Sequence, residues 1–323
     1  MVRLATWFFI CLLFLCGPAL ARDVSFATWL DYFYAEALRE GVSGSTLRKV
    51  LPKLKVDEKV IRLDRKQPEK SIRFSRYYKN VVTPWRIKEG RKLIRQHKAF
   101  FKDISAQGGP SPSVIVALWA VESGYGHNTG KYSVINSLAT LAYEGRRASF
   151  FRRELIEAFK ILDEEKMEHH SLKGSWAGAM GQCQFMPSTY RRYAFDGNGD
   201  GRRDIWEEEH DVLTSIANYL MAEGWNTGKP WGLEVKLKKQ ISKKQKGLDV
   251  IYSFKVWKRL GVLSLNGGKL PSRPSKASLI QPDGTGGRSF LVYDNFRTFM
   301  RWNRSTYFAT SVGLLADALK KGK

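Results

Sequence analysis

Cysteine is scarce in the 323-residue sequence, and histidine is scattered. Only three cysteines occur, Cys11 and Cys16 near the N-terminus and Cys183 in the middle of the chain. Without the N-terminal segment one cysteine remains, which excludes an internal disulfide. Of the five histidines only His169 and His170 are neighbours, so the sequence lacks the clustered ligands of a zinc site. We therefore expect the hydrophobic core alone to stabilise the fold.

Long hydrophobic runs are absent except at the N-terminus. Residues 1–21 contain Arg3, an apolar run from Trp7 to Cys16 and a small-residue end, which is the pattern of a cleavable export signal. The run has about ten residues, roughly half of what a membrane-spanning helix needs. Leu15 disfavours a lipid anchor on the following cysteine, since such sites usually carry a small residue there. We expect a soluble periplasmic protein.

Acidic residues are few compared with basic ones. The sequence has 31 Asp and Glu against 54 Lys and Arg, which gives a formal net charge of +23. In an exported protein this charge does not indicate nucleic acid, which we exclude as a partner. The polyanions outside the inner membrane are phospholipid head groups and the peptide stems of the cell wall. We expect peptidoglycan strands, an anionic membrane surface or cell-wall protein complexes as partners of a monomeric protein. A generally basic, solvated surface explains the charge equally well.

Apolar residues recur at helical spacing through most of the chain. We expect an N-terminal helical region at 22–105, a central core at 106–233, and a helix at 293–323 that returns to this core. At 234–292, short alternating segments such as "LEVKL" and "SFLVYD" are separated by Gly/Pro/Ser-rich stretches and predict a small β-rich insertion. The predicted fold class is mainly α, with a minor β part (α+β).

One carboxylate, Glu122, ends the otherwise apolar segment "VIVALWAVESGYG" at 114–126. Ser111 and Pro112 predict the start of a helix and Gly124 its end. Apolar surroundings raise the pKa of a carboxyl group, and a carboxyl group that keeps its proton serves as a general acid in glycosidic bond cleavage. The spacing alone fits an ordinary salt-bridged glutamate at a helix end at least as well.

Four motifs that follow one another along the chain help to decide the role of Glu122. They are "ALWAVESGYG", "SLATLAYEGRRASFF", "LKGSWAGAMGQCQFMPSTY" and "DGNGDGRRDIWEEEHDVLTSIANYL". Together they resemble the lytic murein transglycosylase B family, glycoside hydrolase family 103, from about residue 26 to the C-terminus. The resemblance implies a lysozyme-like helical core.

The same resemblance implies a one-carboxylate mechanism. Most glycosidases use two carboxylates, yet no Asp or Glu occurs at 174–190. In the resembling family one Glu protonates the bond between N-acetylmuramic acid and N-acetylglucosamine and then activates the muramic acid 6-hydroxyl. The expected product is a 1,6-anhydro sugar, with no organic cofactor. A hydrolytic muramidase of the same fold and a non-catalytic peptidoglycan-binding protein are the alternatives.

Candidate substrate contacts also follow from the resemblance. Ser175 and Gln184 match positions that line the sugar groove, although tight packing with backbone-bonded amides is the alternative. Arg146 and Arg147 are candidates for holding a lactyl or peptide carboxylate, or are simply surface residues.

Tyr143 and Asn303 complete the candidate substrate contacts. Phe185, Trp302 and Tyr307 have rings suited to stacking on a sugar, although each of these aromatic residues fits the core better. Cys183 has no neighbouring histidine in sequence, and we expect an inert thiol.

A calcium loop is predicted at 196–211. "DGNGDGRRDIWE" fits the pattern D-x-[DN]-x-[DN]-G-x5-E without a mismatch. Arg203 occupies a slot that is normally apolar, and the family pattern places the closing carboxylate further downstream. We expect a structural Ca²⁺ here, although a metal-free surface turn is the alternative. The candidate ligands are Asp196, Asn198, Asp200, the carbonyl of Arg202, and either Glu207 or Asp211, with Asp204 acting through water.

Overall fold

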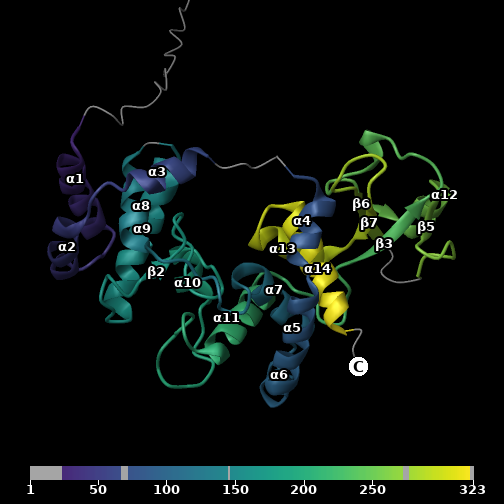
Figure 1. Ribbon diagram of the computed structural model, residues 1–323, viewed down its shortest axis with the longest axis horizontal. Coiled ribbons are helices and arrows are strands. Elements are labelled where there is room, and N and C mark those ends of the chain that lie inside the picture. Colours follow the sequence, from purple (N-terminus) through teal and green to yellow (C-terminus); the bar gives the residue numbers. More distant parts are fainter. Residues whose placement is uncertain (1–23, 67–71, 145, 272–275, 321–323) are drawn as a thin grey trace, which may run out of the picture.

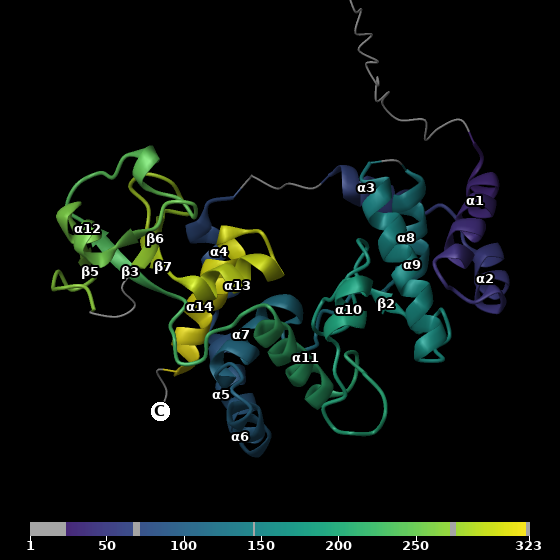
Figure 2. The same cartoon turned by 180° about the vertical axis from the view of Figure 1, so that it is seen from behind.

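The computed structural model describes residues 24–66, 72–144, 146–271 and 276–320. Two groups of helices and one sheet make up these residues, and Figures 1 and 2 place the first group and the sheet at opposite ends of the long axis. The first group contains α1 (Phe26–Arg39), α2 (Gly44–Val50), η1 (Leu51–Lys53), α3 (Glu58–Arg65), α8 (Val134–Tyr143) and α9 (Ala148–Glu164). Within this group, α2 contacts α9, α3 contacts α8, and α8 packs along α9.

The second group surrounds α7 (Pro112–Ser123), which contacts three neighbouring helices. These neighbours are α5 (Pro84–Gln96), α11 (Glu209–Ala222) and α14 (Thr306–Lys320). The group is completed by α4 (Phe74–Val81), α6 (Lys98–Ala106) and α13 (Asp294–Trp302). Between the groups, α10 (Pro187–Tyr193) contacts both α9 and α11 and so joins them (Figure 1). The short strands β1 (Tyr132–Ser133) and β2 (Lys173–Gly174) pair antiparallel beside α8.

Helix α7 is buried around nearly its whole circumference because its sequence is apolar on every face. The residues from Ser113 to Ala120 are all buried. Pro112 occupies the first turn, where its missing N–H costs nothing. Gly124 ends the helix in the left-handed conformation (φ 61°), which glycine adopts without steric strain. This early end leaves Glu122 in the last turn of a core helix.

The β-rich insertion is a five-stranded antiparallel sheet among the described residues, in the order β4-β6-β7-β3-β5. Its strands are β3 (Gly232–Leu237), β4 (Tyr252–Ser253), β5 (Val262–Ser264), β6 (Lys276–Ile280) and β7 (Ser289–Val292), with η2 (Lys243–Gln245) and α12 (Phe254–Arg259) between them. One face has its own core around Trp257 and Leu279, whereas Phe290 on the other face belongs to the main core. Trp231 fixes the sheet to α14, since a Cβ on Gly313 would lie 2.3 Å from its ring.

The predicted fold class is confirmed. The strands β3 to β7 lie between Gly232 and Val292, and α13 and α14 follow them. Two details differ. The region 22–105 is divided, because α1–α3 lie with α8 and α9 whereas α4–α6 lie with the second group. The described part of 293–323 contains two helices, since Asn303 is extended and its side chain accepts a hydrogen bond from Ser305 N.

The predicted export signal at 1–21 lies outside the described residues. Among the helices that the structure does describe, none combines the length and the hydropathy required to span a bilayer.

Candidate active site

Glu122 lies in the last turn of α7, with its carboxyl group half-buried. Trp302, the last residue of α13, donates a hydrogen bond from Nε1 to Glu122 Oε1. Of the described residues, none places a lysine, arginine or histidine in an ion pair with this carboxyl group. The salt-bridged alternative considered from the sequence therefore does not describe Glu122.

Burial raises the pKa of Glu122 to about 8, and the Trp302 hydrogen bond, which favours the charged form, only partly opposes this. A carboxyl group with this pKa keeps its proton at neutral pH. It also gains a carboxylate's basicity once the proton has left. These are the properties of a group that acts first as an acid and then as a base.

Aromatic rings surround the carboxyl group. Trp302 lies against Tyr219 and Phe185, with ring centroids at 4.5 and 5.2 Å. Tyr77 on α4 lies 5.8 Å from Tyr307, and its pKa is raised by burial and by the charge of Glu122. Of the three aromatic candidates, Trp302 contacts Glu122 directly, Phe185 lies against Trp302, and Tyr307 lies against Tyr77.

The segment 174–184 folds as a tight loop next to α7. Ser175 Oγ accepts hydrogen bonds from the backbone N–H groups of Ala177 and Ala179. Gln184 adopts a left-handed conformation (φ 50°), and its Nε2 donates to the carbonyls of Thr129 and Gly181. Both side chains are partly exposed, and within the described residues Gln184 Oε1 has no partner.

Gln182, in the same loop, ties the buried part of the site together. Its Oε1 accepts from Trp119 Nε1 at 2.8 Å, and its Nε2 donates to the carbonyl of Trp206 at 2.8 Å. A Cβ on Gly126 would lie 2.5 Å from this Oε1, so the chain after Glu122 requires glycine there. Cys183 is fully buried, and burial raises its thiol pKa well above the ordinary value.

Arg146 and Arg147 are both held by one buried carboxylate, Asp64 of α3. Arg146 Nε and Arg147 Nη2 each lie 2.7 Å from an Asp64 oxygen. Burial opposes ionisation of Asp64, but the two arginines outweigh it and lower its pKa. Each arginine side chain remains about half exposed (52% and 45%), so its outer face is accessible to solvent.

Tyr143 and Asn303 lie in different surroundings. The Tyr143 hydroxyl donates to the carbonyl of Val24, and its ring packs edge-on against Phe26 and Trp29 of α1. The structure therefore places Tyr143 in the packing of the N-terminal helix. Asn303 is exposed and directly follows Trp302, next to the residue that contacts Glu122.

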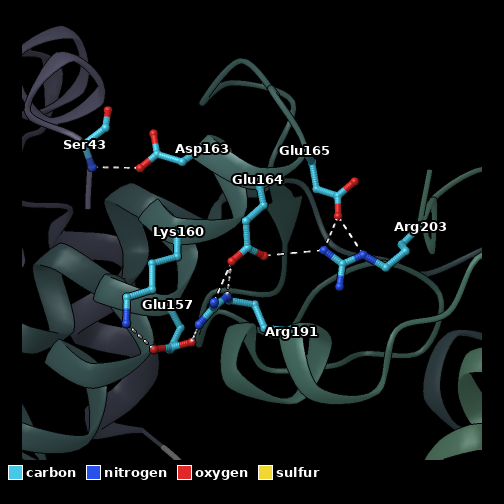
Figure 3. A network of polar contacts seen from close by, with 8 residues as sticks. All are labelled: Ser43, Glu157, Lys160, Asp163, Glu164, Glu165, Arg191 and Arg203. Atoms are coloured by element: carbon cyan, nitrogen blue, oxygen red, sulfur yellow. Dashed lines mark hydrogen bonds and ion pairs between the residues drawn. The ribbon is translucent and has the colours of Figure 1, made fainter. Parts of the chain in front are cut away.

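The acidic loop begins with Asp196, whose carboxylate accepts backbone hydrogen bonds from residues later in the loop. Asp196 accepts backbone N–H groups from Gly199 and Gly201, and Asp200 Oδ2 accepts from the side chain of Asn198. Arg203, unusual for this position, forms ion pairs with Glu164 and Glu165 at the end of α9 (Figure 3).

The ion pairs of Arg203 belong to a larger network that anchors the loop. Arg191 of α10 pairs with Glu157 and Glu164 of α9 in the same network. Asp163 accepts the backbone N–H of Ser43 at 2.8 Å and ties in the start of α2 (Figure 3). The network therefore fixes the acidic loop to the first helical group.

The two candidates for closing the loop differ sharply in environment. Asp211 is fully buried and accepts backbone N–H groups from Gly197 and Asp204, at 2.7 and 2.6 Å. Glu207 is exposed. The loop offers oxygen donors, the type that Ca²⁺ prefers. Among the described residues, the side chains of Glu168, His169 and His170 also lie close together, and Glu168 pairs with Lys49.

Three residues important to this arrangement were missed from the sequence: Tyr77, Asp64 and Gln182. Gln182 lies 63 positions from Trp119 and Asp64 lies 82 from Arg146, and Tyr77 lies 45 positions from Glu122. "FSRYYKN" and "VIRLDRK" carry no pattern that separates these side chains from ordinary helical ones.

Residues 25–317 match the model of a protein family described as the transglycosylase SLT domain. The chain is 32% identical over 292 residues to membrane-bound lytic murein transglycosylase B of Escherichia coli. This alignment covers 87% of this chain and 79% of that relative.

Solved structures agree. SltB3 from Pseudomonas aeruginosa, in complex with NAG-anhNAM-pentapeptide, is 41% identical, with a TM-score of 0.87 over 92% of this chain and 80% of that one. A lytic transglycosylase of Escherichia coli in complex with calcium is 30% identical, with a TM-score of 0.79 over 90% of this chain and 92% of that one.

Proposed function

Because this chain belongs to the transglycosylase SLT domain family and is a lytic transglycosylase of peptidoglycan, we propose that Glu122 is its single catalytic acid and base. The observation that supports this most is the isolation of a half-buried carboxyl group whose pKa burial raises to about 8. Its surroundings in the described residues supply a hydrogen-bond donor, Trp302, but no second carboxylate and no cation.

The first step uses the Glu122 proton. The proton passes to the oxygen that bridges C1 of N-acetylmuramic acid and O4 of N-acetylglucosamine, and the C1–O bond breaks with its electron pair on the departing oxygen. Positive charge develops at C1. The carboxylate left behind is stabilised by the Trp302 N–H, whose hydrogen bond favours the charged form.

The second step returns the proton. The Glu122 carboxylate removes the proton of the muramic acid 6-hydroxyl, and O6 bonds to C1 to close a 1,6-anhydro ring. The enzyme ends with Glu122 protonated again. A two-carboxylate glycosidase instead positions a second Asp or Glu for water or direct attack, and none of the described carboxylates contributes to the pKa of Glu122.

Product analysis separates this mechanism from hydrolysis. Purified sacculi digested with the enzyme are analysed by mass spectrometry for anhydro-muramic and reducing muramic ends. The proposal predicts anhydro ends, and their loss by about 10³-fold or more in Glu122→Gln. Reducing ends alone establish a muramidase, whereas sacculus binding without any cleavage establishes a binding protein.

We propose substrate contacts for those candidate residues that have exposed or unpartnered polar groups. Gln184 and Asn303 are favoured, because the first keeps an unpartnered amide oxygen within the described residues and the second is exposed next to Trp302. Ser175 keeps a donor hydroxyl proton while its oxygen shapes the loop. Arg146 and Arg147 offer half-exposed guanidinium groups to substrate carboxylates.

Tyr143 contacts α1, and we do not include it among the proposed substrate contacts. Its hydroxyl is already committed to the backbone carbonyl of Val24. A stabilising role in packing the N-terminal helix follows from these contacts.

We also propose a structural Ca²⁺ in the acidic loop, supported by the oxygen-donor set and by the relative in complex with calcium. Asp196, Asn198, Asp200 and the Arg202 carbonyl would hold it. Asp211 is favoured over Glu207 to close the site, because it is already fixed between the two ends of the loop.

Export by the signal at 1–21 and action in the periplasm complete the proposal, since peptidoglycan lies outside the inner membrane. Fractionation of cells expressing the full chain tests this location, and a cytoplasmic, uncleaved protein would contradict it.

A further inference from the structure

A groove of ≈ 700 Å³ lies on the β-sheet, and none of its lining residues belongs to the Glu122 site. One wall is β3 with the segment that continues to Ile241, and the other is the loop between β6 and β7. Side chains alternate along a strand, so Val235 enters the sheet core while Glu234 and Lys236 point to the groove side. The groove therefore runs along a strand whose outward residues are charged.

The groove carries uncompensated positive charge. Lys236, Lys238 and Lys239 are exposed, and among the described residues none of them has an ion-pair partner. Glu234 is the acidic residue of the lining, and Arg288 neutralises it with two parallel hydrogen bonds of 2.7 Å. Three lysines thus face a volume in which the one carboxylate is already paired.

The opposite wall is fixed before any ligand arrives. Lys246 Nζ donates to Gln281 Oε1 at 2.5 Å and to Thr285 Oγ1 at 3.2 Å. Asp283 in the same loop accepts the backbone N–H groups of Phe74 and Ser75 from α4. A preformed wall lowers the entropy cost of ordering the site on binding.

The groove also has an apolar part, and it adjoins a second cavity. Leu265 is 46% exposed at its edge. A second cavity of ≈ 560 Å³ shares Glu234, Leu265 and Arg288 with the groove and extends to α14.

Helix α4 lies beside the second cavity, which Tyr78 lines. The Arg288 guanidinium lies 4.7 Å above the ring of Tyr78, while the preceding residue, Tyr77, senses the charge of Glu122. Two adjacent tyrosines of α4 therefore lie near Glu122 and near Arg288 of the groove lining.

We propose that this groove is a second, non-catalytic site that binds the peptide stems of peptidoglycan through their carboxylates. The inference rests on the proposed function, because it takes the same polymer as ligand. The glycan sugars are neutral, so the stems carry the negative charge that three lysines attract. A concave groove along a strand fits an extended peptide, whereas a bilayer presents a flat surface.

The test measures binding to purified sacculi in the full-length Glu122→Gln protein, so that the polymer is not consumed. Lys236→Gln, Lys238→Gln and Lys239→Gln are combined in one variant. The control combines Lys53→Gln, Lys98→Gln and Lys102→Gln, which removes the same charge from exposed lysines of η1 and α6. We expect about tenfold weaker binding for the groove variant and less than about twofold for the control.

Two further probes make the result specific. Chitin oligosaccharides, which are neutral and carry neither stems nor lactyl carboxylates, should bind the parent and both variants equally. Vesicles of phosphatidylglycerol should not distinguish the groove variant from the control.

Equal losses in both variants on sacculi would overturn the proposal, since charge alone would then explain binding. If the groove variant binds vesicles more weakly than the control does but binds sacculi as the parent does, the proposal is wrong and the groove binds a membrane surface. Lysis by the enzyme with Glu122 intact is assayed separately, so a failure of the catalytic proposal is distinguishable from a failure of the groove.

Discussion

The indole Nε1 of Trp302 lies 2.5 Å from Oε1 of Glu122, although the two residues are 180 positions apart. This contact joins the end of α13 to the end of α7. It acts against burial, because the donor stabilises the charged carboxylate that burial disfavours. The balance of these two effects sets the pH at which the acid loses its proton.

Trp302→Phe should move the alkaline limb of the kcat/KM profile to higher pH. The phenyl ring keeps the packing but removes the donor, so the pKa of Glu122 rises further above about 8. Since the first step needs the protonated form, activity then persists to higher pH. Tyr219→Phe is the control, because its ring touches Trp302 while Glu122 keeps its donor. An unchanged or acid-shifted limb in Trp302→Phe would contradict the assigned role.

Glu122→Gln should stabilise the protein at alkaline pH. A carboxyl group with a folded pKa of about 8 and an ordinary value of 4.5 loses folding free energy as pH rises between these values. Removing the ionisation should increase the free energy of unfolding by about 2–4 kcal/mol at pH 9, with little difference at pH 4. Urea denaturation at both pH values measures this, with the exposed Glu40→Gln as control. A gap that is the same at both pH values would mean that Glu122 titrates normally.

Asp64→Asn should destabilise the first helical group. The substitution leaves Arg146 and Arg147 without the buried carboxylate between them, at a cost of about 2–4 kcal/mol near pH 7. Because the folded pKa of Asp64 is lowered, the stability it provides is present above its ordinary pKa of 3.8 and is lost as pH falls further. The difference from the parent should therefore shrink in acid. Denaturant titrations at pH 7 and pH 3 measure it, and an undiminished gap at pH 3 would refute the charge-based explanation.

Calcium should raise the melting temperature, and a chelator should lower it. At a free concentration of 100 times Kd the ion contributes about 2.7 kcal/mol. Asp200→Asn should abolish the shift, whereas the exposed Glu207→Gln should keep it if Asp211 closes the loop. Asp211→Asn should destabilise even the metal-free protein, because its carboxylate accepts two backbone N–H groups. Loss of the calcium shift in Glu207→Gln would reverse the assignment.

The sequence predicted local features well. The helix that carries Glu122, with Pro112 at its start and Gly124 at its end, depends on residues within a few positions of each other. The acidic loop and the alternating strands of the insertion also depend on residues that are close together in sequence. Periodicity and cap residues act over one or two turns, so they are visible in a single sequence.

Long-range partners were not predictable. Whether a cation or an indole contacts Glu122 depends on the position of α13 in the fold. The polar residue Arg203 in a normally apolar position is explained by its ion pairs with Glu164 and Glu165, which are distant in sequence. Tyr143 is a predicted substrate contact, and its packing against Phe26 and Trp29 of α1 could not be read from its neighbours in sequence. These outcomes are decided by packing between distant segments, which one sequence does not encode in any readable pattern.

Infrared difference spectroscopy across a pH titration tests the central claim most directly, because it detects the protonated carboxyl group itself. The spectrum of the parent minus that of Glu122→Gln isolates the C=O band of one residue. We predict that this band disappears with a midpoint near pH 8, as burial requires. A midpoint near pH 4.5 would show that Glu122 is ionised at neutral pH and has no proton to give to the glycosidic oxygen.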